Sequence, residues 1–158
     1  MDGDRVRRSL KRMAYQIAED NRENRAVYLI GIKTRGTLTA RMLGNFLSEI
    51  YGRELPVLNL NINAPDPDLF SEIDVPEAYP LVVDDVIFSG KTMFVALNTI
   101  YGMASFTEMH SAVLVDRGHR KFPVQAQFTG LEYSTKLKEH VSVVTQNDTI
   151  RKVVVGTS

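Results

Sequence analysis

The chain has 158 residues, 44% of them hydrophobic, which is enough for one sizeable core but too short for two ordinary domains. Its 19 basic and 19 acidic residues cancel, so no field of a single sign draws the whole molecule towards nucleic acid or a membrane surface. The absence of cysteine excludes disulfides, thiolate catalysis and zinc sites built on cysteine, and no apolar run approaches the roughly 18 residues of a membrane span.

Helix and strand patterns alternate in the first third of the chain. Apolar residues recur at helical spacing between Val6 and Ala18, with basic residues among them, which predicts an amphipathic helix. The apolar run Val27 to Ile32 is typical of a strand buried on both faces, and it ends at the polar segment Lys33-Thr34-Arg35-Gly36. A second helix is predicted from about Thr37 to Tyr51, with Gly52 as a left-handed cap.

The middle of the chain repeats this order. Val57 to Ile62 reads as a second strand, and the segment from Asn63 to Tyr79, rich in Pro, Asp and Glu, is predicted to be a loop. A third buried strand, Leu81-Val82-Val83, runs into Asp84-Asp85. The next helix is expected from about Lys91 to Tyr101, with Gly102 as its cap.

The last third begins with a fourth strand, Ala112 to Val115, which ends at Asp116-Arg117-Gly118. Helices that separate apolar strands predict an α/β fold with a Rossmann-like, mostly parallel, doubly wound sheet. Three short strands, 125–129, 141–145 and 153–155, are expected to pair antiparallel as a small hood or edge. Because no signal peptide is visible, we expect one cytoplasmic domain over residues 1–158, with no membrane partner.

Three of the predicted strands end in polar segments that contain glycine: 33–36, 84–92 and 116–120. In an open α/β sheet, ligands bind beyond the carboxyl ends of the strands. A turn with glycine that opens a helix offers free backbone N–H groups and the positive end of the helix dipole, which together bind phosphate. The segment Phe88-Ser89-Gly90-Lys91-Thr92 is such a turn.

The same region allows two other interpretations, a P-loop and a simple cap. Gly90-Lys91-Thr92 matches the end of a P-loop, but that motif needs glycine at position 85, where this chain has Asp85. The paired carboxylates of Asp84 and Asp85 suit a diol, or a diol with magnesium, since each accepts hydrogen bonds from hydroxyl groups. The alternative is that one of them only caps the following turn or helix.

The stretch Leu81 to Thr92 resembles the phosphoribosyl pyrophosphate (PRPP) motif of type I phosphoribosyltransferases, which has an apolar strand, two acidic residues and a Thr/Ser-Gly-x-Thr loop. The segments 31–36 and 112–120 are similar to those of one branch, the pyrimidine operon attenuator/uracil phosphoribosyltransferase (PyrR) family. Together the likeness covers roughly residues 5 to 130, with three motifs in order.

This resemblance implies that a nucleobase nitrogen, of uracil by analogy, attacks PRPP and that pyrophosphate leaves with the help of Mg²⁺. It implies that Asp84 and Asp85 hold the ribose hydroxyls, and that no side chain other than these two ligates the metal directly. It also implies that Arg35 assists catalysis within a pyrophosphate site. That site comprises Lys33, Thr34, Arg35 and Gly36, and the 5′-phosphate loop comprises Phe88, Ser89, Gly90, Lys91 and Thr92. The base-side loop comprises Val115, Asp116, Arg117, His119 and Arg120. For the three basic residues of this loop, a solvated turn is the alternative.

The chain departs from the family in one loop. Pro65-Asp66-Pro67-Asp68 stands where the family has a Tyr-Arg-Asp-Asp-like lid, and no Lys or Arg occurs from Glu54 through Gly90. An acidic lid opposes a phosphate-rich ligand, which leaves a PRPP- or nucleotide-sensing regulator as the alternative to an enzyme.

An RNA-binding role, as in family attenuators, is disfavoured by the neutral charge, although His119 and Arg120 remain. His110 and His140 have no partners at metal-ligand spacing and are expected to be structural or exposed. The family also implies a homodimer or a higher even oligomer.

Overall fold

The computed structural model describes residues 1–136 and 138–157. Its main sheet has five parallel strands in the order β2-β1-β3-β4-β5. The strands are β1 (Ala26–Ile32), β2 (Val57–Leu60), β3 (Ala78–Ile87), β4 (His110–Asp116) and β5 (Phe128–Glu132). The central strands β1, β3 and β4 are buried along most of their length, as their continuous apolar runs predicted.

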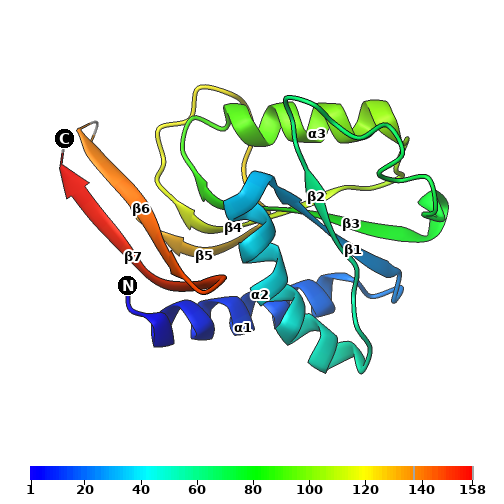
Figure 1. The fold of residues 1–158 in the computed structure, drawn as a ribbon, viewed down its shortest axis with the longest axis horizontal. Coiled ribbons are helices and arrows are strands. Elements are labelled where there is room, and N and C mark those ends of the chain that lie inside the picture. Colours follow the sequence, from blue (N-terminus) through cyan, green and yellow to red (C-terminus); the bar gives the residue numbers. More distant parts are fainter. Residues whose placement is uncertain (137, 158) are drawn as a thin grey trace.

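Helices cover both faces of this sheet. α1 (Gly3–Asp20) and α2 (Lys33–Tyr51) lie on one face, and α3 (Lys91–Met103) lies on the other (Figure 1). Each face has its own core: Leu10, Leu43 and Leu81 belong to the first, and Ile30, Met93 and Ile100 to the second. The expected doubly wound α/β architecture is confirmed.

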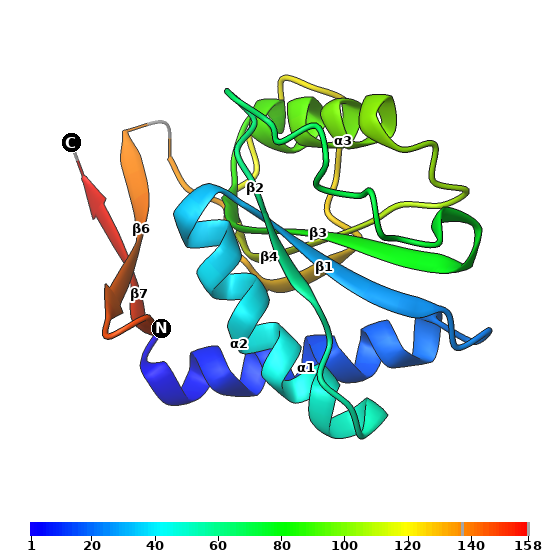
Figure 2. The same ribbon diagram turned by 45° about the vertical axis from the view of Figure 1, so that its right-hand side comes forward.

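The C-terminal strands differ in part from the prediction. β6 (Glu139–Gln146) and β7 (Thr149–Thr157) form a separate antiparallel hairpin, the predicted hood. β5, however, lies at residues 128–132 rather than 125–129 and pairs in parallel with β4, so the expectation of antiparallel pairing was wrong for this strand. Figure 2 shows the hairpin standing beside the first turns of α1 and α2, where the backbones of Met1 and Val153 exchange two hydrogen bonds of 3.0 and 2.9 Å.

Several element boundaries also shift. Lys33 to Gly36 form the first turn of α2 rather than a loop, and Asp84 and Asp85 lie inside β3, because the ladder with β4 continues to Ile87. α3 runs through Gly102 to Met103 and is capped by Ala104, so Gly102 is not the cap. Gly52 does cap α2, with φ 68°.

The predicted loop from Asn63 to Tyr79 divides into two parts. Residues 63–68 are exposed, whereas Phe70 is only 6% exposed and packs edge-on against Phe106, with ring centroids 5.4 Å apart. A short 3-10 helix, η1 (Val75–Glu77), follows, and residues 78 and 79 already belong to β3. The second half of the segment is therefore fixed on the α3 face of the core.

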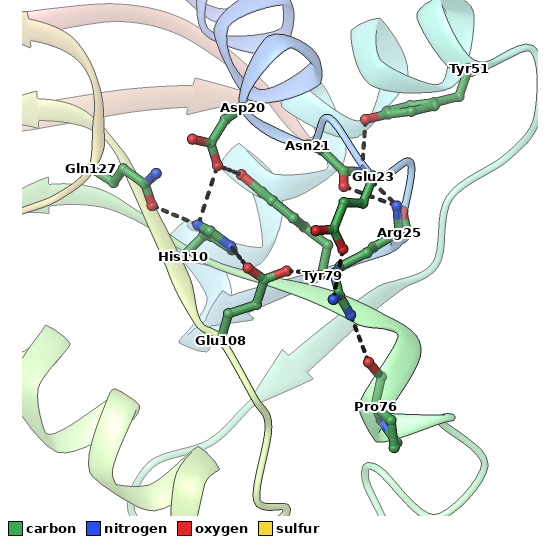
Figure 3. Close-up of polar contacts among 10 residues, drawn as sticks. All are labelled: Asp20, Asn21, Glu23, Arg25, Tyr51, Pro76, Tyr79, Glu108, His110 and Gln127. Carbon is green, nitrogen blue, oxygen red and sulfur yellow. Dashed lines mark hydrogen bonds and ion pairs between the residues drawn. The ribbon is translucent and has the colours of Figure 1, made fainter.

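A polar cluster lies at the amino-terminal edge of the sheet, where β3 and β4 begin (Figure 3). The ring of Tyr79 stacks on His110 with centroids 3.8 Å apart, and its hydroxyl donates to Asp20 at 2.7 Å. Burial, together with the bond to Asp20, raises the pKa of Tyr79. Arg25 pairs with Glu23 and Glu108 and donates to the Pro76 carbonyl at 2.7 Å.

His110 is thus a structural residue, and His140 is exposed, as expected for both. No helix in residues 1–136 or 138–157 is long and apolar enough to cross a membrane.

Candidate functional site

Three strand ends meet at the carboxyl edge of the sheet. β1 leads into α2 on one face, and its neighbour β3 leads into α3 on the other, so the chain diverges between these two strands. Such a switch point is where α/β sheets bind ligands. The structure brings two of the predicted segments, 33–36 and 88–92, to this point, with the end of β4 next to them.

The 33–36 turn is held by side chains around Lys33, a residue with the left-handed φ of 55°. Its carbonyl accepts hydrogen bonds from the Thr37 hydroxyl at 2.5 Å and from the Asn59 amide at 3.0 Å. Asn59 also donates to Thr37 at 2.7 Å. The sequence prediction missed Asn59, although a lone amide within the apolar strand Val57–Leu60 is a signal that could have identified it.

Two glycines allow this turn to lie directly on the sheet. A Cβ atom at Gly31 would lie 2.2 Å from the Thr37 Cα, and one at Gly36 would lie 2.7 Å from the Val83 carbonyl oxygen and 3.3 Å from an Asp84 carboxyl oxygen. Contacts this short with backbone atoms exclude any side chain at Gly31 without a shift of the backbone. The 33–36 turn therefore sits against the acidic pair.

Asp84 and Asp85 form a half-buried carboxyl pair at the end of β3. One oxygen of Asp84 accepts from the Asp85 N–H at 2.9 Å, and one oxygen of Asp85 accepts from the Val86 N–H at 2.8 Å. Burial, followed by the charge of Asp85, raises the pKa of Asp84 to about 8, against a smaller lowering by Lys33. The folded protein therefore disfavours the ionised form of Asp84 in the absence of a ligand.

The 88–92 loop opens α3 without a side-chain cap. Gly90 precedes the first helical residue with φ 87°, a conformation that favours glycine. The Ser89 hydroxyl accepts from the Lys91 N–H at 3.2 Å, and Lys91 and Thr92 are exposed. This geometry leaves backbone N–H groups at the positive end of a 13-residue helix, which is suited to an anion.

The 116–120 segment is built differently from the prediction. Val115 is a buried core residue of β4 and not part of a loop, because β4 continues to Asp116. Arg117 is only 8% exposed, and its guanidinium carbon lies 4.1 Å from the centroid of the Phe88 ring. The alternative interpretation of Arg117, as part of a solvated turn, is therefore wrong. His119 is exposed, but its ring donates to the Thr135 carbonyl.

The arginines of the site are engaged within the protein. Arg117 donates to the Thr135 hydroxyl at 3.2 Å and to the Glu139 carbonyl, and Arg35 donates to the Val143 carbonyl of β6. The hood therefore contacts both the 33–36 turn and the 116–120 segment. The assignment of Arg35 to a pyrophosphate stays a prediction.

No group of three or more His, Asp or Glu residues is arranged to hold a metal ion within residues 1–136 and 138–157. The acidic pair suits magnesium in another way, since Mg²⁺ in phosphate-transfer sites is bound by one or two carboxylates together with the phosphates of the substrate. Asp84 and Asp85 fit that pattern.

Comparisons with known proteins agree with this geometry. Residues 2–146 match the Phosphoribosyl transferase domain family. The chain is 34% identical to the "Bifunctional protein PyrR" of Limosilactobacillus reuteri, with 92% of this chain and 90% of that protein covered. It is 33% identical to the protein of the same name in Chloroflexus aurantiacus, with 98% and 92% covered.

Solved structures share the fold. A hypoxanthine phosphoribosyltransferase from Trypanosoma cruzi matches with a TM-score of 0.70 at 15% identity, over 84% of this chain and 73% of that one. A hypoxanthine-guanine phosphoribosyltransferase from Bacillus anthracis matches with a TM-score of 0.70 at 16% identity, over 98% of both chains.

Proposed function

The chain belongs to the Phosphoribosyl transferase domain family, and we propose that it transfers the ribose 5-phosphate of PRPP to a nucleobase and releases pyrophosphate. The observation that carries this proposal is the meeting of the 33–36 turn, the Asp84-Asp85 pair and the 88–92 loop at the switch point of the sheet. Uracil is the proposed acceptor, by the resemblance to PyrR proteins.

In this proposal the ligand spans all three segments. The N–H groups and hydroxyls of Ser89 to Thr92 bind the 5′-phosphate, Asp84 and Asp85 accept from the two ribose hydroxyls, and Lys33 to Gly36 bind the pyrophosphate. The base nitrogen forms a bond to the anomeric carbon as the bond from that carbon to pyrophosphate breaks, and the proton of that nitrogen passes to the surrounding water. Charge grows on the leaving oxygen, so cations on the 33–36 side stabilise the transition state.

Magnesium, if bound by the pyrophosphate and the acidic pair, supplies charge neutralisation for the departing group. Burial and the neighbouring Asp85 raise the pKa of Asp84, and a cation next to the pair would lower it again, because a cation favours the ionised form. A cytoplasmic location remains part of the proposal.

A second candidate is a PRPP- or nucleotide-sensing regulator with little turnover. The observation in its favour is the exposed 63–68 segment, which bears Asp66 and Asp68 and lies in a stretch without Lys or Arg from Glu54 through Gly90. An RNA-binding role is weaker, because Arg117 and Arg120 are engaged by protein groups.

The test is nucleotide formation from Mg-PRPP with uracil, guanine, hypoxanthine, adenine and orotate, alongside calorimetric binding of Mg-PRPP. We expect Mg-PRPP to bind and uracil to give nucleotide, with pyrophosphate released in equal amount. Binding without nucleotide from any base would support the regulator instead. Absence of binding would contradict both candidates.

A further inference from the structure

We propose that Arg120 is a positioning residue that holds the 88–92 loop in its phosphate-binding shape and does not contact the base. This inference rests on the proposed function. It is based on the hydrogen bonds of the Arg120 guanidinium, which donates to the Phe88 carbonyl at 2.7 Å, the Val124 carbonyl at 2.8 Å and an Asp116 carboxyl oxygen at 2.7 Å. A longer bond of 3.5 Å reaches the Gly118 carbonyl.

The surroundings of Arg120 leave its charge internally compensated. The side chains of Arg120 and Asp116 are only 18% and 17% exposed, so their ion pair is not a solvated surface contact. Asp116 is fixed in turn, because its other oxygen accepts from the Gly118 N–H at 2.9 Å. The guanidinium therefore connects the end of β4 to the residue that follows β3, and we call this contact the Arg120 brace.

The backbone of the next residues extends the same contact. The N–H groups of Lys121 and Phe122 both donate to the Ser89 carbonyl, at 2.8 and 3.0 Å. The carbonyls of Phe88 and Ser89 thus both point towards residues 120–122. Two consecutive peptide units of the loop are oriented by one segment.

This orientation decides where the loop's donors point. In a planar trans peptide the carbonyl and the N–H point in opposite directions. The N–H groups of Ser89 and Gly90 therefore point away from residues 120–122, and neither donates to a backbone acceptor in the part of the chain that the structure describes. Arg120 thus helps to aim two free donors at the position proposed for the 5′-phosphate.

Gly90 shows how closely the brace fits. A Cβ atom there would lie 3.2 Å from Cδ of Arg120 and 3.3 Å from the Phe122 carbonyl oxygen. The aliphatic stem of Arg120 therefore lies directly behind the glycine of the loop. Arginine suits this place because its planar fork reaches three acceptors, which a lysine ammonium on a flexible stem cannot reach together in the same geometry.

The experiment compares Arg120→Lys and Arg120→Gln with the wild type in calorimetric binding of Mg-PRPP, and in KM for PRPP and for uracil. Arg25→Gln is the matched control. Like Arg120, Arg25 binds a backbone carbonyl and carboxylate groups, but it lies at the amino-terminal edge of the sheet, away from the proposed site. We expect both Arg120 variants to weaken Mg-PRPP binding by about ten- to a hundredfold, since loss of positioning misplaces the donors. The KM for uracil at saturating PRPP should stay within about twofold, and Arg25→Gln should leave PRPP affinity unchanged.

A second readout separates positioning from general destabilisation. In Arg120→Gln, amide hydrogen exchange should accelerate at Lys121 and Phe122, while β1 keeps its wild-type protection. The inference is overturned if the variants bind Mg-PRPP as tightly as the wild type, or if they raise the uracil KM instead of the PRPP Kd. Failure of the wild type itself to bind Mg-PRPP would instead refute the proposed function, and this inference with it.

Discussion

At the scale of single residues, the acidic pair carries two properties that mutation can separate. Asp85 contributes a carboxylate to the proposed diol site, whereas Asp84 contributes a carboxyl that the folded protein prefers to keep protonated. The first property concerns the affinity for PRPP, and the second concerns stability as a function of pH.

The first prediction is that Asp85→Asn weakens Mg-PRPP binding about tenfold or more. A charge-assisted hydrogen bond is worth roughly 1.5 to 3 kcal/mol, and the amide loses the charge while it keeps the shape. Calorimetry on Asp84→Asn and Asp85→Asn checks this. Unchanged affinity in both variants would contradict the diol assignment.

The second prediction concerns stability. The folded protein holds the Asp84 proton up to about pH 8, whereas the ordinary pKa is 3.8, so the folded state binds more protons between these values. The contribution of this group to the free energy of unfolding therefore falls as pH rises from 4 to 8, by at most about 1.4 kcal/mol per unit. Urea unfolding should show that Asp84→Asn flattens this decline, whereas Asp74→Asn, an exposed control, does not. Identical pH profiles for Asp84→Asn and the wild type would exclude Asp84 as the titrating group.

Local pattern was enough to place Asp84, Asp85 and Gly90 together at the carboxyl edge of the sheet, because the strand, the acidic pair and the turn are contiguous in sequence. The role of Arg117 was not predictable, since it depends on Thr135 and Glu139, which the fold alone brings near. The same holds for Asn59, whose partner Lys33 lies 26 residues earlier.

At the scale of elements, less of the acidic segment after β2 is free to cover the proposed site than its sequence suggests. Phe70 buries its ring against Phe106, and Arg25 holds Pro76, so only residues up to about 68 are free of the core. The part that can approach a ligand is therefore the part that bears Asp66 and Asp68.

The third prediction is that Pro65→Tyr with Asp66→Arg raises kcat for uracil transfer more than it raises PRPP affinity. A cation in this segment acts mainly as charge develops on the leaving pyrophosphate, and one unit charge at 4 Å is worth up to about 4 kcal/mol at an effective dielectric of 20. Pro65→Tyr with Asp66→Gln is the matched neutral control. Steady-state kinetics on both double variants measure the difference.

This prediction depends on slow turnover in the wild type. If the unmodified protein already transfers uracil at an ordinary rate of about 10 per second, the charge of the 63–68 segment is not what limits it.

The order of the elements followed from the sequence, because buried parallel strands leave continuous apolar runs such as Val27 to Ile32. The direction of β5 did not follow from the sequence, since the residue pattern of an edge strand is the same whether the strand pairs in parallel or antiparallel. Its contact with α1, where Arg12 donates to the Gly130 carbonyl at 2.6 Å, spans 118 residues.

At the scale of the whole molecule, large apolar side chains remain exposed. Tyr101 and Phe94 lie on α3, and Val154 and Val155 lie on β7. Exposed groups of this kind are common on interfaces between copies of one chain.

The fourth prediction is that the protein forms a dimer or a higher even oligomer at micromolar concentration, with light scattering as the measurement. Tyr101→Arg and Val155→Arg test the two exposed faces, and the one that lowers the mass lies in the interface. A monomeric mass for the wild type would contradict the prediction.

The pairing of Met1 with Val153 has a consequence for synthesis. A ribosome adds about 5 to 20 residues per second, so the beginning of α1 waits on the order of ten seconds for the strand that completes it. A two-stranded hairpin is barely stable alone, so the hood persists only by packing against α1 and α2. Because Arg35 and Arg117 bind hood carbonyls, this side of the proposed site is completed only after the hood strands have been made and have docked.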